Sequence, residues 1–138
     1  MTLKRNKTDH RDYKLRANVE DVLILPKKFD IPILPPVRNQ GNIGSCHSHS
    51  CVGILETQLL NKRPNKFLEL SELYHYWVAR HYISGDGDQD NGQSIRDGFK
   101  AASKYNLATE YAWGYDTSKF NVKPPFYAFM TSGFYKIS

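Results

Sequence analysis

The sequence contains few cysteines, and their spacing argues against a disulfide. Only Cys46 and Cys51 occur among the 138 residues. Five residues along a helix separate two Cα atoms by about 7.5 Å in axial rise alone, which is more than a disulfide spans comfortably. We therefore expect two free thiols, with Cys51 as a small core residue rather than a reactive one.

The sequence also lacks a long apolar run. No stretch approaches the length of a membrane-spanning helix, and the opening residues Met-Thr-Leu-Lys-Arg do not begin a signal peptide. We therefore expect a cytoplasmic protein that makes no membrane contact. With 40% hydrophobic and 24% charged residues, the chain can form one domain with a modest core.

The net charge of +5 is concentrated near the N-terminus, where residues 1–16 carry six basic and two acidic side chains. This arm contains one aromatic residue, Tyr13, and no recognisable partner motif. We therefore expect a solvated terminus rather than a surface that binds nucleic acid or an acidic membrane. The sequence divides accordingly into a basic arm, residues 1–20, and a domain, residues 21–138.

Apolar spacing predicts a long helix that begins near Cys46 and runs to about Leu60. Val52, Leu55 and Leu59 recur on one face, which we expect to be buried. The sequence Arg-Pro-Asn at residues 63–65 ends the helix, because proline cannot continue it.

Two shorter helices are predicted after the long one. The first has Ser71 as its N-cap and stops around residues 84–85. The second has Ser94 as its N-cap, with Asp97 three residues later, and ends near Asn106, which suits a left-handed backbone. Their expected buried faces are Leu73, Tyr74, Trp77, Val78 and His81 in the first, and Ile95, Phe99 and Ala102 in the second.

The remaining segments give weaker patterns. Residues 3–36 contain only short extended pieces. Residues 126–137, which follow two consecutive prolines, are predicted as a strand.

The segment 39–51, Asn-Gln-Gly-Asn-Ile-Gly-Ser-Cys-His-Ser-His-Ser-Cys, places a cysteine where a glycine-containing loop gives way to a helix. The first-turn N–H groups of a helix lack intrahelical partners and lie at the positive end of its dipole, so they favour the anionic form of Cys46. A thiolate is a nucleophile, whereas a thiol is not. Gly41 and Gly44 permit a sharp turn, and Gln40 carries an amide that can point at the same reacting centre.

Residues 36–41, Pro-Val-Arg-Asn-Gln-Gly, together with Gly-Ser-Cys at residues 44–46, resemble the start of the papain-like cysteine peptidases, the C1 family. In that family the cysteine attacks the scissile carbonyl, and the glutamine side chain and the cysteine N–H stabilise the oxyanion. The resemblance implies these catalytic roles for Cys46 and Gln40. It also implies a peptide or protein as substrate.

Two positions depart from the family signature. Ile43 stands where the signature has its first cysteine, which forms a disulfide in secreted members, and this suggests a reducing compartment. His47 stands where the signature has an aromatic residue, a change that removes no catalytic atom. Further similarities, to the microbial and viral branch of the family, occur in order at residues 8–13, 25–30, 91–99, 104–107, 110 and 113–115.

The family places its base histidine and the orienting asparagine about 130–150 residues after the cysteine. Only 92 residues follow Cys46, so the sequence resembles the nucleophile-bearing first lobe without the second. The resemblance implies an α+β, papain-like fold, here a mainly helical left lobe whose long central helix starts at Cys46, with the β-barrel-like second lobe largely absent. A separate chain that supplies the histidine and asparagine is then a candidate partner. We also expect an exposed apolar face that such a partner would cover, and self-association of the isolated chain.

The acidic loop at residues 86–92 imitates the first half of a calcium-binding EF-hand. Position six is Asn91 instead of glycine, and position twelve lacks the usual glutamate, so a solvated turn is the favoured interpretation. The residues at ligand positions one, three, five and twelve would be Asp86, Asp88, Asp90 and Asp97. In the family, the segment just before the following helix lines the substrate cleft, which makes Gly92 and Gln93 candidate substrate contacts.

Two cysteines and two histidines at residues 46–51 are also potential zinc ligands, but on a helix they form two pairs that point apart. A structural zinc site needs four converging ligands, and only three scattered histidines remain elsewhere in the sequence. We therefore expect no metal or other cofactor. We interpret His47 and His49 as helix-packing residues, neither of which is placed to act as the base for Cys46.

Three functions follow from these observations. The first is the nucleophile-bearing lobe of a papain-like cysteine peptidase. The second is a catalytically inactive papain-like module that retains half of the binding groove. The third and least favoured is a structural domain that depends on calcium or zinc.

Overall fold

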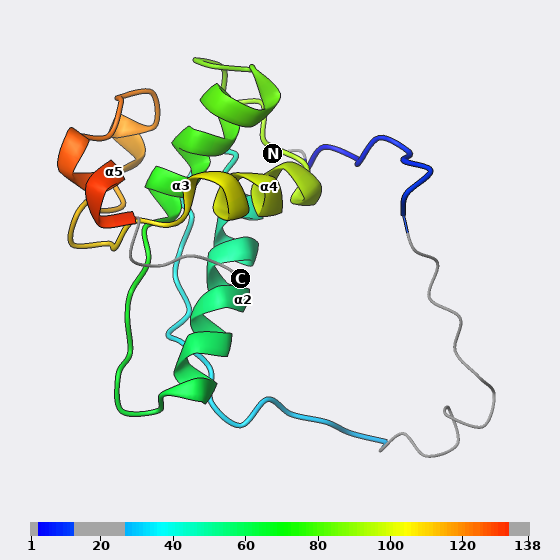
Figure 1. Cartoon of the computed structure of the whole chain (residues 1–138), viewed down its shortest axis with the longest axis vertical. Helices are drawn as coiled ribbons and strands as arrows, with labels where there is room; N and C mark the ends of the chain where they lie inside the picture. Colours follow the sequence, from blue (N-terminus) through cyan, green and yellow to red (C-terminus); the bar gives the residue numbers. More distant parts are fainter. Residues whose placement is uncertain (1–2, 13–26, 133–138) are drawn as a thin grey trace.

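The computed structural model describes residues 3–12 and 27–132. Within these residues the chain folds into a group of packed helices, and the descriptions below refer to that part (Figure 1). The α-helices are α2 (Cys46–Lys62), α3 (Glu72–Val78), α4 (Ile95–Tyr105) and α5 (Phe126–Ser132), with a π-helical segment η1 (Ala79–Ser84) and a 3-10 turn η2 (Thr117–Lys119).

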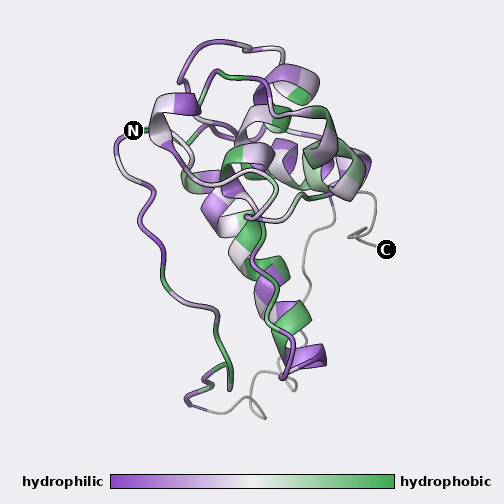
Figure 2. Cartoon of the chain, turned by 90° about the vertical axis from the view of Figure 1, so that its left-hand side faces the viewer, coloured by the Kyte–Doolittle hydropathy of each residue, from purple (hydrophilic) through white to green (hydrophobic). Residues whose placement is uncertain are grey.

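Helix α2 is the longest element and begins at Cys46, as predicted. Val52 and Leu55 are buried, and Leu59 packs against the same cluster, so the predicted face is confirmed. The helix ends where the Arg63 N–H donates to the Leu59 carbonyl across 2.9 Å. Its C-terminal half projects beyond the other helices, as both Figure 1 and Figure 2 show.

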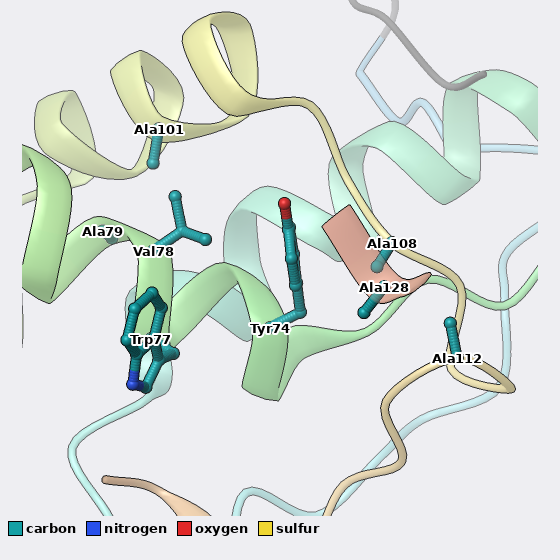
Figure 3. Close-up of a cluster of buried hydrophobic side chains, with 8 residues drawn as sticks. All are labelled: Tyr74, Trp77, Val78, Ala79, Ala101, Ala108, Ala112 and Ala128. Carbon is teal, nitrogen blue, oxygen red and sulfur yellow. The ribbon is translucent and has the colours of Figure 1, made fainter. Parts of the chain in front are cut away.

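Helix α3 is capped by Ser71, whose side chain accepts a hydrogen bond from the Tyr74 N–H across 3.0 Å. The predicted apolar stripe is too narrow, because every residue of α3 is buried. Other segments cover the helix on all sides, and even Glu72 and His75 lie inside. Figure 3 shows the resulting cluster of Tyr74, Trp77, Val78, Ala79, Ala101, Ala108, Ala112 and Ala128.

The helix that was predicted to start after Ser71 stops where expected, although its last part is π-helical. Element η1 continues α3 directly and ends at Gly85, which adopts a left-handed conformation with φ of 73°. A left-handed glycine is a common helix terminator because it has no Cβ to clash with the preceding turn.

The predicted buried face of α4 is wrong at Phe99, whose side chain is exposed. The helix instead packs through Gly98, Ala101 and Ala102. A Cβ at Gly98 would lie 2.9 Å from the sulfur of Cys51, so α4 approaches α2 too closely for a large side chain on that face. The predicted N-cap is confirmed, because Ser94 accepts from the Asp97 N–H. Asn106 follows the helix with a positive φ of 60°, but its ψ of −165° lies outside the left-handed helical region that was predicted.

The strand predicted at residues 126–137 is wrong for its first part, which forms helix α5. Phe126 and Tyr127 are exposed, and the residues that α5 buries, Ala128 and Ser132, lie four positions apart on one helical face. Proline is well tolerated at the start of a helix, which suits the preceding Pro125. Residues 133–137 lie outside the described residues.

No strand occurs among the described residues, which contain only an isolated antiparallel bridge between Leu70 and Thr109. The prediction of a mainly helical lobe is therefore confirmed. Residues 3–12 and 27–36 contain no helix, in agreement with the sequence, while residues 13–26 lie outside the described part. None of the helices in the described ranges has the length and apolar character required to cross a bilayer.

Candidate active site

Cys46 is the first residue of α2 and is a half-buried free thiol. The first turn of the helix contains no acidic side chain that would oppose a thiolate. The N–H groups of this turn point toward the helix start, where they favour negative charge. The structure thus places Cys46 in the position that the sequence predicts.

The loop before α2, residues 39–45, is called the nucleophile loop below. Gly41 has a φ of 65°, and its N–H donates to the Asn39 side chain across 2.9 Å, which closes a tight turn. The Gln40 side-chain amide donates to the Ile43 carbonyl across 2.9 Å. This bond holds the Gln40 amide against the loop that leads into Cys46.

Tyr115 joins the two ends of the nucleophile loop. Its hydroxyl donates to the Gln40 carbonyl across 2.8 Å and lies 2.6 Å from the Ser45 hydroxyl. A phenol has one hydrogen, which the carbonyl receives, so Ser45 donates to Tyr115. Burial raises the pKa of Tyr115 above its ordinary value, which keeps the hydroxyl protonated and able to donate. The edge of its ring contacts His49, with ring centroids 5.0 Å apart.

An ion cluster fixes the chain just before the nucleophile loop. Arg38 pairs with the buried carboxylate of Glu56, and its Nε lies 2.7 Å from an oxygen of the equally buried Glu72. A Glu56 oxygen also accepts from the Leu70 N–H across 2.7 Å. Burial raises the pKa of Glu72 to about 7, and the neighbouring Arg38 opposes that rise. The backbone two residues before Gln40 is therefore anchored to both α2 and α3.

His47 is fully buried and belongs to a chain of hydrogen bonds that fixes its tautomer. His75 Nε2 faces the Gly98 carbonyl at 2.9 Å and must donate to it, so its Nδ1 accepts from the Ser48 hydroxyl, also at 2.9 Å. Ser48 in turn accepts from His47 Nε2 across 3.1 Å. Burial is the main cause that lowers the pKa of His47 to about 2 and that of His75 to about 4.

Both of these buried rings are therefore neutral, and the prediction that His47 packs within the helix layer is confirmed. The sequence contains five histidines, all of them among the described residues. The other three also have partners: His49 lies 3.2 Å from the Ser45 carbonyl, His81 stacks on Trp77, and His10 is exposed beside Asp9.

The two candidate substrate contacts lie at the end of the acidic loop. Gly92 is buried and has a φ of 65°. Gln93 is fully buried as a whole residue, so both its side chain and its main chain are covered in this structure. The Gln93 carbonyl already accepts a hydrogen bond from the Lys4 N–H across 3.3 Å.

The described part of the basic arm, residues 3–12, is mostly exposed, as expected for a solvated terminus, yet it is tied to the domain. Lys4 pairs with Asp86, and Arg96 of α4 lies 2.6 Å from Asp12 and 3.4 Å from Asp9. The predicted boundary at residue 20 lies outside the described residues.

The acidic loop contains a turn and is exposed at residues 88–91, in agreement with the favoured interpretation, but its carboxylates also have partners elsewhere in the chain. Asp86 pairs with Lys4, Asp90 accepts from the Gly44 N–H across 2.7 Å, and Asp97 belongs to the cap of α4. The carboxylates thus take separate partners. In the part of the chain that the structure describes, no three His, Cys, Asp or Glu side chains are grouped so that they could hold a metal ion.

An apolar groove runs along α2, starting one turn beyond Cys46. It has a volume of about 610 Å³ and lies between α2 and the extended segment 31–38. Val37 is 100% exposed at its rim, and Leu34 and Ile54 are also exposed. An exposed apolar face was expected from the sequence, and the structure places it along α2, one turn beyond Cys46.

Sequence reasoning missed the side chains that hold this site together. In the sequence, Tyr115 belongs only to a short similarity to the family at residues 113–115, and Asp90 only to a loop that imitates a calcium site. Both act across more than 40 residues of sequence. Local patterns carry no signal for such contacts.

The family described as papain family cysteine protease matches residues 25–123. An uncharacterized peptidase C1-like protein of Acanthamoeba polyphaga mimivirus is 31% identical over 125 residues, which cover 86% of this chain and 40% of that protein.

Two solved structures share the fold of this chain. Xylellain, a cysteine protease from Xylella fastidiosa, superposes with a TM-score of 0.83 and 25% identity over 99% of this chain and 55% of that one. A structure from work on the mite allergens Blo t 1 and Der p 1 shares the fold, with a TM-score of 0.56 and 24% identity over 67% of this chain and 31% of that one.

The chain spans about half or less of the length of these relatives. The family match covers most of the sequence and includes the nucleophile loop and Cys46. This chain therefore belongs to the papain family of cysteine proteases.

Proposed function

We propose that this chain provides the nucleophile and an oxyanion donor of a papain-type cysteine peptidase. The observation that carries the proposal is the placement of Cys46, a free thiol on the first residue of α2, at the end of a loop that also carries Gln40. The Cys46 sulfur attacks the carbonyl carbon of a peptide bond in a peptide or protein substrate. The Cys46 N–H and the Gln40 amide then donate hydrogen bonds to the oxyanion that forms.

The base for this reaction is proposed to come from outside the 138 residues. The five histidines all have other partners, and the two on the α2–α3 interface are buried and neutral. A histidine oriented by an asparagine, on a further segment or on a separate chain, would accept the Cys46 proton and give it to the leaving amine. The shares of the relatives that this chain spans, 40% and 55%, support a site completed by additional residues.

Gly92 and Gln93 are proposed to contact the substrate through their main chain. Pairing of an extended peptide with backbone groups is a common mode of recognition. Because both residues are buried, the segments that cover them have to move before a peptide can pair there. The Lys4 N–H already occupies the Gln93 carbonyl, so a substrate strand that uses this carbonyl has to replace that bond. The free thiols of Cys46 and Cys51 suit a reducing compartment such as the cytoplasm.

The reactivity of Cys46 tests the proposal without any second lobe. Iodoacetamide should modify Cys46 roughly ten-fold or more faster at neutral pH than a cysteine in an unfolded peptide. Cys51 is the internal control, because it is fully buried and burial raises its pKa to about 11. Mass spectrometry of the digested protein measures both rates, and a Cys46 rate no faster than that of the peptide would contradict the proposal.

A cleavage assay tests the complete reaction. The chain is assayed alone and with a polypeptide that supplies the histidine and asparagine, and thiol-dependent cleavage is expected only in the mixture. Absence of cleavage in both, with both polypeptides folded, would refute the peptidase assignment for this chain.

An inactive binding module is the second candidate, favoured by the engagement of all five histidines elsewhere. It predicts ordinary Cys46 reactivity together with measurable binding of extended peptides. Isothermal titration of extended peptides into the Cys46→Ser variant measures the binding. The alkylation rate of the unaltered chain separates the two candidates, because only the peptidase proposal requires fast alkylation.

A further inference from the structure

Asp90 connects the acidic loop to the nucleophile loop. One of its carboxylate oxygens accepts a hydrogen bond from the Gly44 N–H across 2.7 Å. The same oxygen accepts a second hydrogen bond from the Tyr76 hydroxyl. Gly44 lies two residues before Cys46, and Asp90 lies two residues before Gly92. The carboxylate therefore joins the chain that carries the nucleophile to the chain that carries the proposed substrate contacts.

The two loops also touch directly. A Cβ on Gly44 would lie 2.9 Å from the bound Asp90 oxygen, 3.0 Å from the Gly92 nitrogen and 3.2 Å from the Gly92 Cα. These distances leave no room for a side chain at position 44, because the Gly92 nitrogen and Cα belong to the backbone and cannot turn away as a side chain could. Glycine at position 44 thus permits the approach, and the Asp90 hydrogen bonds hold the two loops at that distance.

Tyr76 and Arg80 support the acidic loop from inside the protein. The Arg80 guanidinium is fully buried and lies 4.3 Å from the centre of the Tyr76 ring. It donates to the Gly87 carbonyl across 3.0 Å and to the Gln89 carbonyl across 3.2 Å. The loop backbone before Asp90 and the hydroxyl that binds Asp90 are therefore positioned by one buried cation.

Ile43 leaves the nucleophile loop without the first cysteine of the family signature. Where the family signature has a cysteine that forms a disulfide in secreted members, this chain has an isoleucine that is buried with Leu73 and Tyr76. The free thiols of Cys46 and Cys51 leave the nucleophile loop with no covalent crosslink. Hydrogen bonds to Asp90 hold the neighbouring residue, Gly44, instead.

We propose that Asp90 is a positioning residue that holds the Cys46 loop against the Gly92–Gln93 backbone, by hydrogen bonds rather than by a disulfide. The proposal rests on the function proposed above, because it concerns the alignment of the nucleophile with the substrate contacts. It assigns Asp90 a structural task that does not depend on the redox state of the surroundings.

Amide hydrogen exchange tests the connection independently of Cys46 chemistry. In the unaltered chain the Gly44 N–H should be protected. In Asp90→Ala its exchange should accelerate by roughly three- to ten-fold, the change expected when one partly exposed hydrogen bond is lost. Asp90→Asn keeps an oxygen acceptor and should restore most of the protection. Asp88→Ala alters the same loop at a largely exposed carboxylate and should leave Gly44 unchanged.

Two alkylation rates test the positioning role. Iodoacetamide reports the thiol alone, while a peptidyl chloromethyl ketone reports the thiol and the substrate contacts together. Asp90→Ala should lower the ratio of the peptidyl rate to the iodoacetamide rate by roughly three- to ten-fold, and Asp90→Asn should recover it to within about two-fold.

Tyr76→Phe provides the same test if Asp90→Ala does not fold, because it keeps the buried ring and removes one donor to Asp90. Unchanged Gly44 exchange in folded Asp90→Ala, or in Tyr76→Phe where it replaces that variant, would overturn the proposal. An unchanged rate ratio in the same variant, with a Cys46 that reacts fast, would also overturn it. Slow Cys46 alkylation in the unaltered chain would instead overturn the proposed peptidase function, while the exchange data still decide the role of Asp90.

Discussion

The Tyr115 hydroxyl donates to the Gln40 carbonyl across 2.8 Å and accepts from Ser45, so one side chain holds both ends of the nucleophile loop. Tyr115 and Gln40 are 75 positions apart in sequence. This contact keeps the proposed oxyanion donor at a constant position relative to Cys46. It also makes residues 113–115, which precede η2, part of the site.

Tyr115→Phe should loosen the nucleophile loop while leaving the ring in place beside His49. The loss of two hydrogen bonds should lower the free energy of unfolding by about 1–2 kcal/mol and slow the alkylation of Cys46 by a peptidyl chloromethyl ketone. Urea denaturation and mass spectrometry measure the two effects. Tyr111→Phe is the matched control, because Tyr111 is 100% exposed, and equal behaviour of the two variants would refute the role of Tyr115.

Gly98→Ala and Gly53→Ala should change stability in opposite directions. A Cβ on Gly98 would lie 2.9 Å from the Cys51 sulfur and 3.1 Å from the His47 ring, so overpacking should cost about 1–3 kcal/mol. A Cβ on Gly53 meets nothing within 4 Å, and alanine there should add about 0.5–1 kcal/mol because it favours helix. Thermal unfolding measures both. A stabilised Gly98→Ala variant would contradict the observed approach of α4 to α2.

Acid should destabilise the fold through His47 and His75. Their pKa values in the folded protein, about 2 and about 4, lie below the ordinary value of 6.5. Between pH 6.5 and 4 the unfolded chain therefore binds more protons than the folded chain, and the free energy of unfolding falls as pH falls. Glu72 has the opposite effect, because its pKa is raised in the folded protein from 4.5 to about 7. Between these pH values the folded chain binds more protons at Glu72 than the unfolded chain, so this group raises the free energy of unfolding as pH falls.

Urea titrations at pH 7 and pH 4.5 measure this dependence. His75→Gln should show a smaller loss of stability on acidification than the unaltered chain, and Glu72→Gln should show a larger one. His10→Gln changes an exposed ring and serves as the control. If His75→Gln and the control lose the same stability between the two pH values, the buried neutral His75 is not a source of the acid sensitivity.

The apolar groove along α2 should cause the isolated chain to self-associate. Exposed apolar patches promote association, and Val37 at the rim is fully exposed. Light scattering should detect oligomers at concentrations on the order of tens of micromolar. Val37→Lys should reduce their fraction, whereas Val122→Lys, at a half-exposed position outside the groove, should not. A monodisperse unaltered monomer would show that the groove does not drive association.

Local sequence patterns were sufficient for the first three helices and for the position of Cys46 at the start of α2. Ser71 and Ser94 cap their helices by short-range hydrogen bonds, and Gly85 ends η1 by its own backbone conformation. These features depend on neighbouring residues alone. Residues 126–132 form helix α5 instead of the predicted strand, and only the packing of the folded chain makes Ala128 and Ser132 its buried face.

The sequence by itself determined that Cys46 starts a helix behind a glycine-containing loop, six residues after Gln40. Helix caps, turns and the start of the dipole all act over a few residues, so spacing alone predicts them. The tertiary structure decided how that loop is held, through Tyr115 on one side and Asp90 on the other. The Asp90 contact spans 46 positions of sequence and the Tyr115 contact spans 75. No local pattern encodes which distant side chain a carbonyl or N–H will meet.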